Sequence, residues 1–208
     1  MSDEPVSGGS LQRRSLILGA GLTLAAPAVV RAQAAKPRVV IKTGRGLIVV
    51  ELEHRRAPLT TANFLKYVDA QSYDGGTFFR AARTPGVEKD GTIVGAPDAK
   101  VRPFPPIRHE ATNQTGVKHL NGTISLGRFA PGTATNNFFI CVGDQPYLDA
   151  NPGAPGDNRG YAAFGRVVSG MSVVERILSL PTNGATRFAD QAGQWLKPPV
   201  SIVSMRRA

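Results

Sequence analysis

Gly46-Leu47-Ile48-Val49-Val50-Glu51-Leu52 is a run of β-branched and apolar residues that predicts a β-strand. Short runs of the same kind recur along most of the chain. They cover Val39 to Lys42, Leu47 to Leu52, Thr77 to Ala81, Thr123 to Leu126, Phe138 to Val142, Ala162 to Val168 and Val200 to Met205. Because the runs are short and separated by turn-forming residues, they favour a mainly β protein with an antiparallel sheet, closed into a barrel.

Two segments predict helices instead of strands. Pro58 opens the first, and Leu59, Ala62, Leu65 and Val68 follow at three-residue steps, which predicts an apolar stripe that lies on the sheet. In the second, Ser172 and Glu175 have the spacing of a capping box, and Pro181 prevents continuation after about three turns.

The segments between these elements are rich in glycine and proline and show little periodicity. The chief ones are Thr84 to Pro106, Ala130 to Asn136 and Asp149 to Gly160. We interpret them as loops, and loops held on a rigid sheet commonly carry the binding surface.

The first 34 residues have the pattern of a targeting segment. Arg13 and Arg14 precede an apolar run from Ser15 to Val30, and Ala32-Gln33-Ala34 has the small-x-small pattern of a cleavage site. The paired arginines resemble a twin-arginine signal, with an ordinary secretory signal as the alternative, and the run is too short for a stable membrane anchor. We therefore predict export to the periplasm with cleavage after Ala34.

Residues 35 to 208 have the length of one domain. The segment before them holds three of the 25 basic and two of the 15 acidic residues, so this domain carries a formal charge of +9. Its lysines and arginines are scattered rather than clustered, which indicates solubility and nonspecific attraction. A nucleic-acid binder would interleave aromatic and basic patches, and we expect no nucleic-acid partner.

The reactive residue types form no familiar catalytic or metal-binding pattern. Cys141 is the only cysteine and lies in an apolar run, so we predict a buried packing residue and no internal disulfide. His54, His109 and His119 lack metal-ligand spacing. Hydrolase, phosphate-binding, zinc-protease and dinucleotide motifs are missing, and we predict neither metal nor cofactor.

A series of motifs in the mature chain resembles bacterial cyclophilin-type peptidyl-prolyl isomerases. The matching blocks are Gly46 to Leu52, Ala57-Pro58-Leu59-Thr60-Thr61-Ala62-Asn63-Phe64, Tyr73-Asp74-Gly75-Gly76-Thr77-Phe78-Phe79-Arg80, Gly122 to Leu126, Asn136 to Ile140, Leu148-Asp149 and Tyr161 to Val168. Their shared order implies a closed eight-stranded cyclophilin-like barrel capped by two α-helices. The resemblance also implies a monomer without a cofactor, whose partners are proline-containing, unfolded or partly folded polypeptides.

The resemblance assigns roles to individual residues. Arg80 matches the catalytic arginine, Phe139 the floor of the proline pocket and Leu148 its wall. Tyr161 lies where relatives have a substrate-contacting histidine or tyrosine. The main chain of Gly127 and Arg128 matches a strand edge that pairs with the peptide.

Four further positions carry residues that differ from the usual ones. Phe79 replaces a histidine, and Asn137 occupies a substrate-binding position that is usually glutamine. Val94 stands where a glutamine normally orients the arginine. Tyr147 matches a tryptophan through which relatives often bind cyclosporin, so we expect weak cyclosporin binding.

The chemistry of the reaction fits an arginine without the family name. An X-Pro bond resists rotation by about 18–20 kcal/mol because of amide resonance. A guanidinium that donates to the proline nitrogen stabilises the twisted state, where that nitrogen gains a lone pair, more than the planar state. We therefore expect an isomerase that assists the folding of exported proteins. The alternative, supported by Val94 and Asn137, is a catalytically weak module that binds proline-containing peptides as a chaperone or adaptor.

Overall fold

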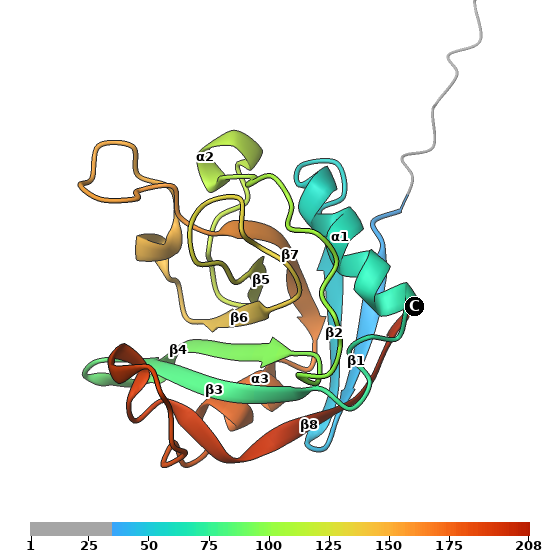
Figure 1. The fold of residues 1–208 in the computed structure, drawn as a ribbon, viewed down its shortest axis with the longest axis vertical. Coiled ribbons are helices and arrows are strands. Elements are labelled where there is room, and N and C mark those ends of the chain that lie inside the picture. The colour runs from blue at the N-terminus through green and yellow to red at the C-terminus, as the bar shows by residue number, and fades with distance from the viewer. Residues whose placement is uncertain (1–34) are drawn as a thin grey trace, which may run out of the picture. The chain divides into compact units, whose positions relative to one another are not determined.

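Eight antiparallel strands close into a barrel in the computed structural model, which describes residues 35 to 208 (Figure 1). They are β1 (Arg38–Thr43), β2 (Gly46–Leu52), β3 (Thr77–Thr84), β4 (Val87–Ala96), β5 (Thr123–Leu126), β6 (Phe138–Val142), β7 (Ala162–Ser169) and β8 (Trp195–Arg207). The order around the barrel is β1-β2-β7-β5-β6-β4-β3-β8, and β8 pairs with β1. The predicted closed barrel is confirmed. The predicted signal, with its cleavage site at Ala34, lies outside the described residues.

Strand β4 corrects one sequence prediction, because it lies inside the Thr84 to Pro106 segment that we interpreted as a loop. Two of its residues are glycines, which lower the strand propensity that the sequence shows. A Cβ on Gly91 would collide with the carbonyl oxygen of Ala82, and one on Gly95 would lie 2.7 Å from the Phe138 ring. Glycine is therefore required where β4 approaches its neighbours, and pairing with β3 and β6 forms the strand despite its low propensity.

The barrel interior is filled by apolar side chains with a cluster of aromatic rings at its centre. The Phe138 ring makes edge contacts with the rings of Phe64, Tyr73 and Phe78, at centroid distances of 5.8, 5.5 and 5.6 Å. All four side chains are fully buried. Such pairs stabilise a core beyond the area that they bury.

Three helices pack around the barrel, one more than the two expected. Within residues 35–208 they are α1 (Pro58–Asp69), α2 (Thr112–Thr115) and α3 (Met171–Leu178). Two short 3-10 helices lie elsewhere, η1 (Pro146–Leu148) between β6 and β7 and η2 (Ala189–Gln191) between α3 and β8. Helix α1 packs on β7 and β8, whereas α3 packs on β2, β3, β4 and β6. Helix α2 is a single turn that ends at Gly116, whose φ of 67° is left-handed. No helix in residues 35–208 is long and apolar enough to cross a membrane.

Helix α1 begins at Pro58 as predicted, but the predicted stripe of buried residues is partly wrong. Leu65 and Val68 are buried, whereas Leu59 and Ala62 are exposed. The reason is that three-residue steps drift away from the 3.6-residue period of a helix. The buried face instead adds Phe64 and other residues. These are Thr60, Thr61, Asn63 and Tyr67.

Helix α3 corrects the predicted capping box. Its N-cap is Gly170, in a left-handed conformation with φ of 86°, and no side chain caps it. A Cβ at Gly170 would collide with the carbonyl oxygen of Leu47, so the tight passage between β7 and α3 requires glycine. Ser172 therefore lies inside the helix, which spans eight residues rather than three turns.

Glu110 caps helix α1 from a distant segment. Its carboxylate accepts hydrogen bonds from the backbone N–H groups of Leu59 and Thr60, at 3.1 and 2.8 Å, and from the Thr60 hydroxyl at 2.7 Å. Glu110 is only 8% exposed. A carboxylate here satisfies free donors of the first helical turn and opposes the positive end of the helix dipole.

We expect Glu110→Ala to lower the free energy of unfolding by about 2–3 kcal/mol, because buried donors lose a charged acceptor. Urea denaturation followed by circular dichroism measures this loss. The matched control is Glu175→Ala on the exposed face of α3, which we expect to change stability little. Equal stabilities of wild type and Glu110→Ala would contradict the capping role.

Candidate active site

Four neighbouring strands bring the main predicted site residues into one row across the barrel. Arg80 on β3 pairs with Val94 on β4, Val94 with Phe139 on β6, and Phe139 with Ser125 on β5. Their strand neighbours, such as Phe138, belong to the core, whereas these four residues do not. The row therefore lies on the outer face of the barrel. From strand spacing, the Cα atoms of Arg80 and Phe139 lie about 10 Å apart.

A β-bulge directs Arg80 to this outer face. The pairing of β3 with β4 shifts register between Phe78 and Arg80, so Phe79 is the extra residue. Phe78 and Ala81 are buried in the core, while Phe79 and Arg80 are both half-buried. Bulges re-aim side chains in this way, and they occur often beside active sites.

Arg80 is held at one edge of its guanidinium group. Its Nε donates a hydrogen bond to Oε1 of Gln194 at 2.7 Å. Neither Nη atom donates to a protein acceptor in the described part of the chain. Burial lowers the pKa of Arg80, and nearby Tyr161, Asp190 and Tyr147 oppose that effect. Arginine stays charged under such shifts, so a cation with two free donor nitrogens remains at the surface.

Phe139 lies between two ring partners that fix its orientation. Its ring stacks on the imidazole of His119, with centroids 5.8 Å apart and planes 14° from parallel, and Tyr161 approaches edge-on at 5.3 Å. Phe139 is 5% exposed, so only a small part of the ring reaches the surface. Phe139 and Tyr161, both predicted site residues, are in contact here, whereas the sequence analysis assigned no role in the site to His119.

Ser125, His119 and Asp149 form a hydrogen-bonded chain beneath Phe139. Nδ1 of His119 lies 2.8 Å from Oδ1 of Asp149, and Nε2 lies 3.0 Å from Oγ of Ser125. Because a carboxylate only accepts, Nδ1 donates to Asp149, and Nε2 accepts from Ser125. The geometry resembles a hydrolase triad, but Ser125 is completely buried, so no substrate can reach its hydroxyl. These three hydrogen-bonded side chains instead hold the His119 ring in place beneath Phe139.

The buried histidines make stability depend on pH. Burial lowers the pKa of His119, which Asp149 partly opposes, and burial likewise lowers the pKa of His109. In the unfolded chain both groups titrate near their ordinary pKa of about 6.5. As the pH falls through that value, the unfolded state therefore binds protons first.

We expect the urea concentration at the midpoint of unfolding to decrease when the pH is lowered from about 7.5 to about 5.5. The decrease should be smaller for His119→Gln. The same denaturation series at both pH values, on wild type and variant, measures this difference. A midpoint that is constant, or that rises on acidification, would contradict the expected sign.

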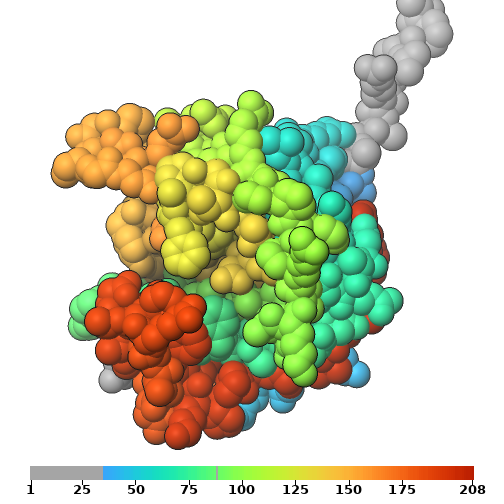
Figure 2. All heavy atoms as spheres, in the orientation of Figure 1, coloured from blue at the N-terminus to red at the C-terminus, as the bar shows by residue number. Residues whose placement is uncertain are grey.

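Several predicted substrate-binding residues surround the row. Leu148 is half-buried in η1, and the preceding Tyr147 is 69% exposed. Asn137 is exposed, and its carbonyl oxygen accepts a hydrogen bond from the Gly127 N–H at 2.8 Å. Figure 2 shows the surface hollowed between the C-terminal segment in red and the yellow and gold segments that include these loops.

The side chain of Arg128 is held by several contacts, whereas its backbone N–H and C=O groups have no partner in the described residues. Its guanidinium donates to Asp157 and to the carbonyl oxygen of Gly160, and it lies 5.1 Å from the centre of the Tyr161 ring. Within residues 35–208, no hydrogen bond forms to its backbone N–H or C=O. A backbone segment that is fixed in place but unpaired can bind an extended peptide.

Comparisons with known proteins agree with this geometry. The sequence profile of the family "Cyclophilin type peptidyl-prolyl cis-trans isomerase/CLD" matches residues 38–207. The chain belongs to the cyclophilin-type peptidyl-prolyl cis-trans isomerases. It is 32% identical to a peptidyl-prolyl cis-trans isomerase of Acinetobacter baylyi over 197 residues, covering 94% of this chain and 95% of the relative. It is 34% identical to isomerase B of Escherichia coli, covering 73% and 90%.

Solved cyclophilin structures share the barrel. A cyclophilin-type isomerase of Cryptosporidium parvum superposes with a TM-score of 0.65 at 17% identity, covering 83% of this chain and 98% of that protein. A second structure of that protein, solved in the presence of the dipeptide Ala-Pro, has a TM-score of 0.64 at 18% identity. The predicted fold and enzyme class of this cyclophilin are confirmed.

The structure places two residues beside the site that the sequence prediction did not include. Gln194 contacts Arg80 directly. Phe129 follows Arg128, whose main chain is unpaired in residues 35–208, and its side chain is 85% exposed. Trp195 packs on Phe79 with ring centroids 5.0 Å apart. Both the exposure of Phe129 and the Gln194 contact are visible only in the folded chain.

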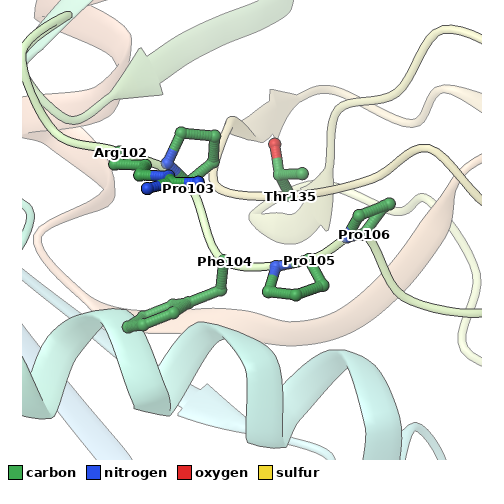
Figure 3. A pocket seen from close by; sticks show the side chains of 6 residues that line it. All are labelled: Arg102, Pro103, Phe104, Pro105, Pro106 and Thr135. Atoms are coloured by element: carbon green, nitrogen blue, oxygen red, sulfur yellow. The ribbon is translucent and has the colours of Figure 1, made fainter.

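Two other hollows of this cyclophilin lie outside the row. One is lined by Arg102, Thr135 and the proline-rich segment 103–106, whose Phe104 points toward α1 (Figure 3). The Phe104 ring lies 4.7 Å from that of Tyr67. The other lies at the N-terminal end of α1 and beside α2, and its lining includes Arg55, Arg56, Arg108 and Arg159. Neither hollow includes Arg80 or Phe139.

The structure supplies no alternative chemistry for the reactive side chains. In residues 35–208 no three histidine, cysteine or acidic side chains cluster in a way that could hold a metal ion. Cys141 is buried, as predicted, and burial raises the pKa of its thiol. A thiol in such surroundings is unreactive at neutral pH.

Proposed function

We propose that this cyclophilin rotates X-Pro bonds in exported polypeptides, with Arg80 as the catalytic residue. The observation that carries the proposal is the state of the Arg80 guanidinium, which is anchored through Nε and has both Nη groups free. The proline ring would lie on Phe139, with Leu148 beside it. An arginine side chain spans much of the roughly 10 Å between the two positions.

In this arrangement the protein holds one side of the bond while the other side turns. The ring rests against Phe139 and Tyr161, which are fixed by their aromatic partners. The preceding residues pair with the unpaired main chain of Arg128 and with Gly127, and exposed Asn137 adds polar contacts. Phe79 packs against Trp195 and so borders the site beside Arg80. Tyr147, exposed on η1, forms the outer rim.

Arg80 then acts on the proline nitrogen. As the bond twists, resonance is lost and the nitrogen becomes a hydrogen-bond acceptor. An Nη donor that contacts this nitrogen stabilises the twisted state, and partial burial strengthens the interaction by excluding water. The step requires neither a nucleophile nor a cofactor.

Exchange NMR on a short Ala-Pro peptide tests the activity. Uncatalysed isomerisation takes tens to hundreds of seconds, too slow for exchange peaks. We expect catalytic amounts of the protein to produce exchange peaks between the cis and trans signals. Peptide binding without exchange would instead support a chaperone or adaptor that binds proline-containing chains.

The cellular part of the proposal is export across the inner membrane into the periplasm, followed by action on unfolded clients. Its support is the sequence of residues 1–34, with Arg13-Arg14, an apolar run and Ala32-Gln33-Ala34. Exported proteins refold outside the cytoplasm, where slow proline isomerisation can limit folding.

We expect the protein recovered from a periplasmic fraction to begin at Ala35. Intact-mass measurement and N-terminal peptide sequencing check this. Replacement of Arg13 and Arg14 by lysine should block export if the twin-arginine route is used, and it should leave export intact by the general secretory route. Recovery of the uncleaved chain from the cytoplasm alone would contradict the assignment.

A further inference from the structure

We infer that Gln194 is the positioning residue of Arg80, and that it orients the guanidinium toward the substrate from the segment preceding β8. The inference rests on the proposed role of Arg80. It concerns a residue 114 positions away in the chain whose side chain is the acceptor for Arg80 Nε. No other side chain in the described residues accepts a hydrogen bond from Arg80.

The neighbour of Arg80 across the sheet cannot supply this contact. Val94 pairs directly with Arg80 on the antiparallel strand, and its side chain has no polar atom. Side chains at such paired positions have Cβ atoms about 5 Å apart, so a longer polar residue at position 94 could reach the guanidinium. With valine there, the acceptor comes from Gln194 on the other side of β3.

Gln194 is itself held in place through its main chain. Its carbonyl oxygen accepts a hydrogen bond from the Ala81 N–H at 2.8 Å, directly after Arg80 in sequence. Its own N–H donates to the carbonyl oxygen of Gln191. The acceptor is therefore fixed to the strand whose side chain it orients, as positioning requires.

The rest of the segment is anchored to β3 as well. Arg83 donates to the carbonyl oxygen of Leu180 at 2.5 Å and to the Thr182 hydroxyl at 3.3 Å. At the other end, Trp195 packs on Phe79, and its indole N–H donates to the Gln191 side chain at 3.3 Å. Residues 180–195 thus contact β3 on both sides of Arg80, which limits movement of Gln194 relative to the guanidinium.

The hydrogen bond has a specific consequence for the guanidinium group. Occupying Nε fixes the plane of the group and leaves the two Nη nitrogens as the free donors. Because Gln194 is neutral, it orients the cation without neutralising its charge. A carboxylate would reduce the positive potential that the twisted bond requires.

The test compares wild type, Gln194→Met, and Gln194→Met combined with Val94→Gln. Methionine keeps the size of glutamine but removes the acceptor. We expect Gln194→Met to lower kcat/KM in the exchange NMR assay by about tenfold to a hundredfold, as for a lost hydrogen bond to a charged group. Peptide affinity should change less than threefold or so, because positioning acts on the turning bond. Val94→Gln should restore a substantial part of the rate, because its side-chain oxygen can accept a hydrogen bond from Arg80 across the strand pair.

Two controls separate positioning from a general loosening of the segment. Gln191→Ala removes a hydrogen bond of the same segment without contact to Arg80, and we expect it to change kcat/KM little. The Nε–H signal of Arg80 in ¹H–¹⁵N spectra should be discrete and slowly exchanging in wild type. It should broaden in Gln194→Met and return with Val94→Gln. These spectra do not depend on turnover.

Equal rates for wild type and Gln194→Met would overturn the inference, as would an equal loss in Gln191→Ala or a wild-type Arg80 Nε–H signal that exchanges freely. These outcomes differ from failure of the proposed function, in which Arg80→Ala is as active as wild type. In that case the spectra still decide whether Gln194 orients the guanidinium.

Discussion

Arg80→Ala is expected to lower kcat/KM for an Ala-Pro peptide by about a hundredfold to a thousandfold, the range for removal of one donor to developing charge. Alanine leaves the bulged backbone in place and removes the guanidinium that donates to Gln194. Peptide binding should largely persist, because the surfaces of Phe139 and Tyr161 remain. Exchange NMR measures the rate, and chemical-shift titration measures the affinity.

Two matched variants sharpen the interpretation of the Arg80→Ala result. Arg166→Ala removes an exposed strand arginine on β7, away from the row, and should keep the wild-type rate. Arg80→Lys keeps the charge but loses the Nε donor and the planar fork, and we expect an intermediate rate. If Arg80→Ala retains full activity, the catalytic role assigned to Arg80 is wrong.

The second large effect concerns the core. Phe138→Ala should lower the free energy of unfolding by about 3–5 kcal/mol, because it removes the central ring of the aromatic cluster and leaves a cavity. Since whole domains are stable by only about 5–15 kcal/mol, such a loss would leave the protein marginally folded. Urea denaturation monitored by the single tryptophan, Trp195, provides the measurement.

The adjacent Phe139→Ala is the control for this prediction, since it alters the same residue type one position along β6. Phe139 lies outside the core cluster. We expect a loss of stability less than half as large, together with a strong loss of isomerase activity. Similar destabilisation by both variants would show that the two side chains do not divide between core and site as inferred.

Local pattern predicted the strands whose residues favour extended structure on their own. The runs Thr123 to Leu126 and Phe138 to Val142 coincide with β5 and β6. Strand β4 escaped because close contact with Ala82 and Phe138 selects glycine there. A pattern that is imposed by neighbours distant in sequence is invisible to a propensity argument.

The residues of the candidate site also fall into those that the sequence indicated and those that only the structure revealed. The order of motifs indicated Arg80, Phe139 and Tyr161, and the structure brings them together on one face. The resemblance also predicted that Val94 stands where relatives have a glutamine. The residue that contacts Arg80 instead was not predicted, because Gln194 lies in a segment without a matching motif and meets β3 only in the folded chain.

Closure of the sheet has a consequence for a protein whose proposed clients are unfolded. Chains with exposed strands adhere to any sheet that presents a free border, and this is a common start of co-aggregation. Every strand here has a neighbour on each side, from β1 round to β8. A client segment therefore finds no unpaired strand in residues 35–208. It can pair only with the short main-chain segment at Gly127 and Arg128, which can release it once its proline has turned.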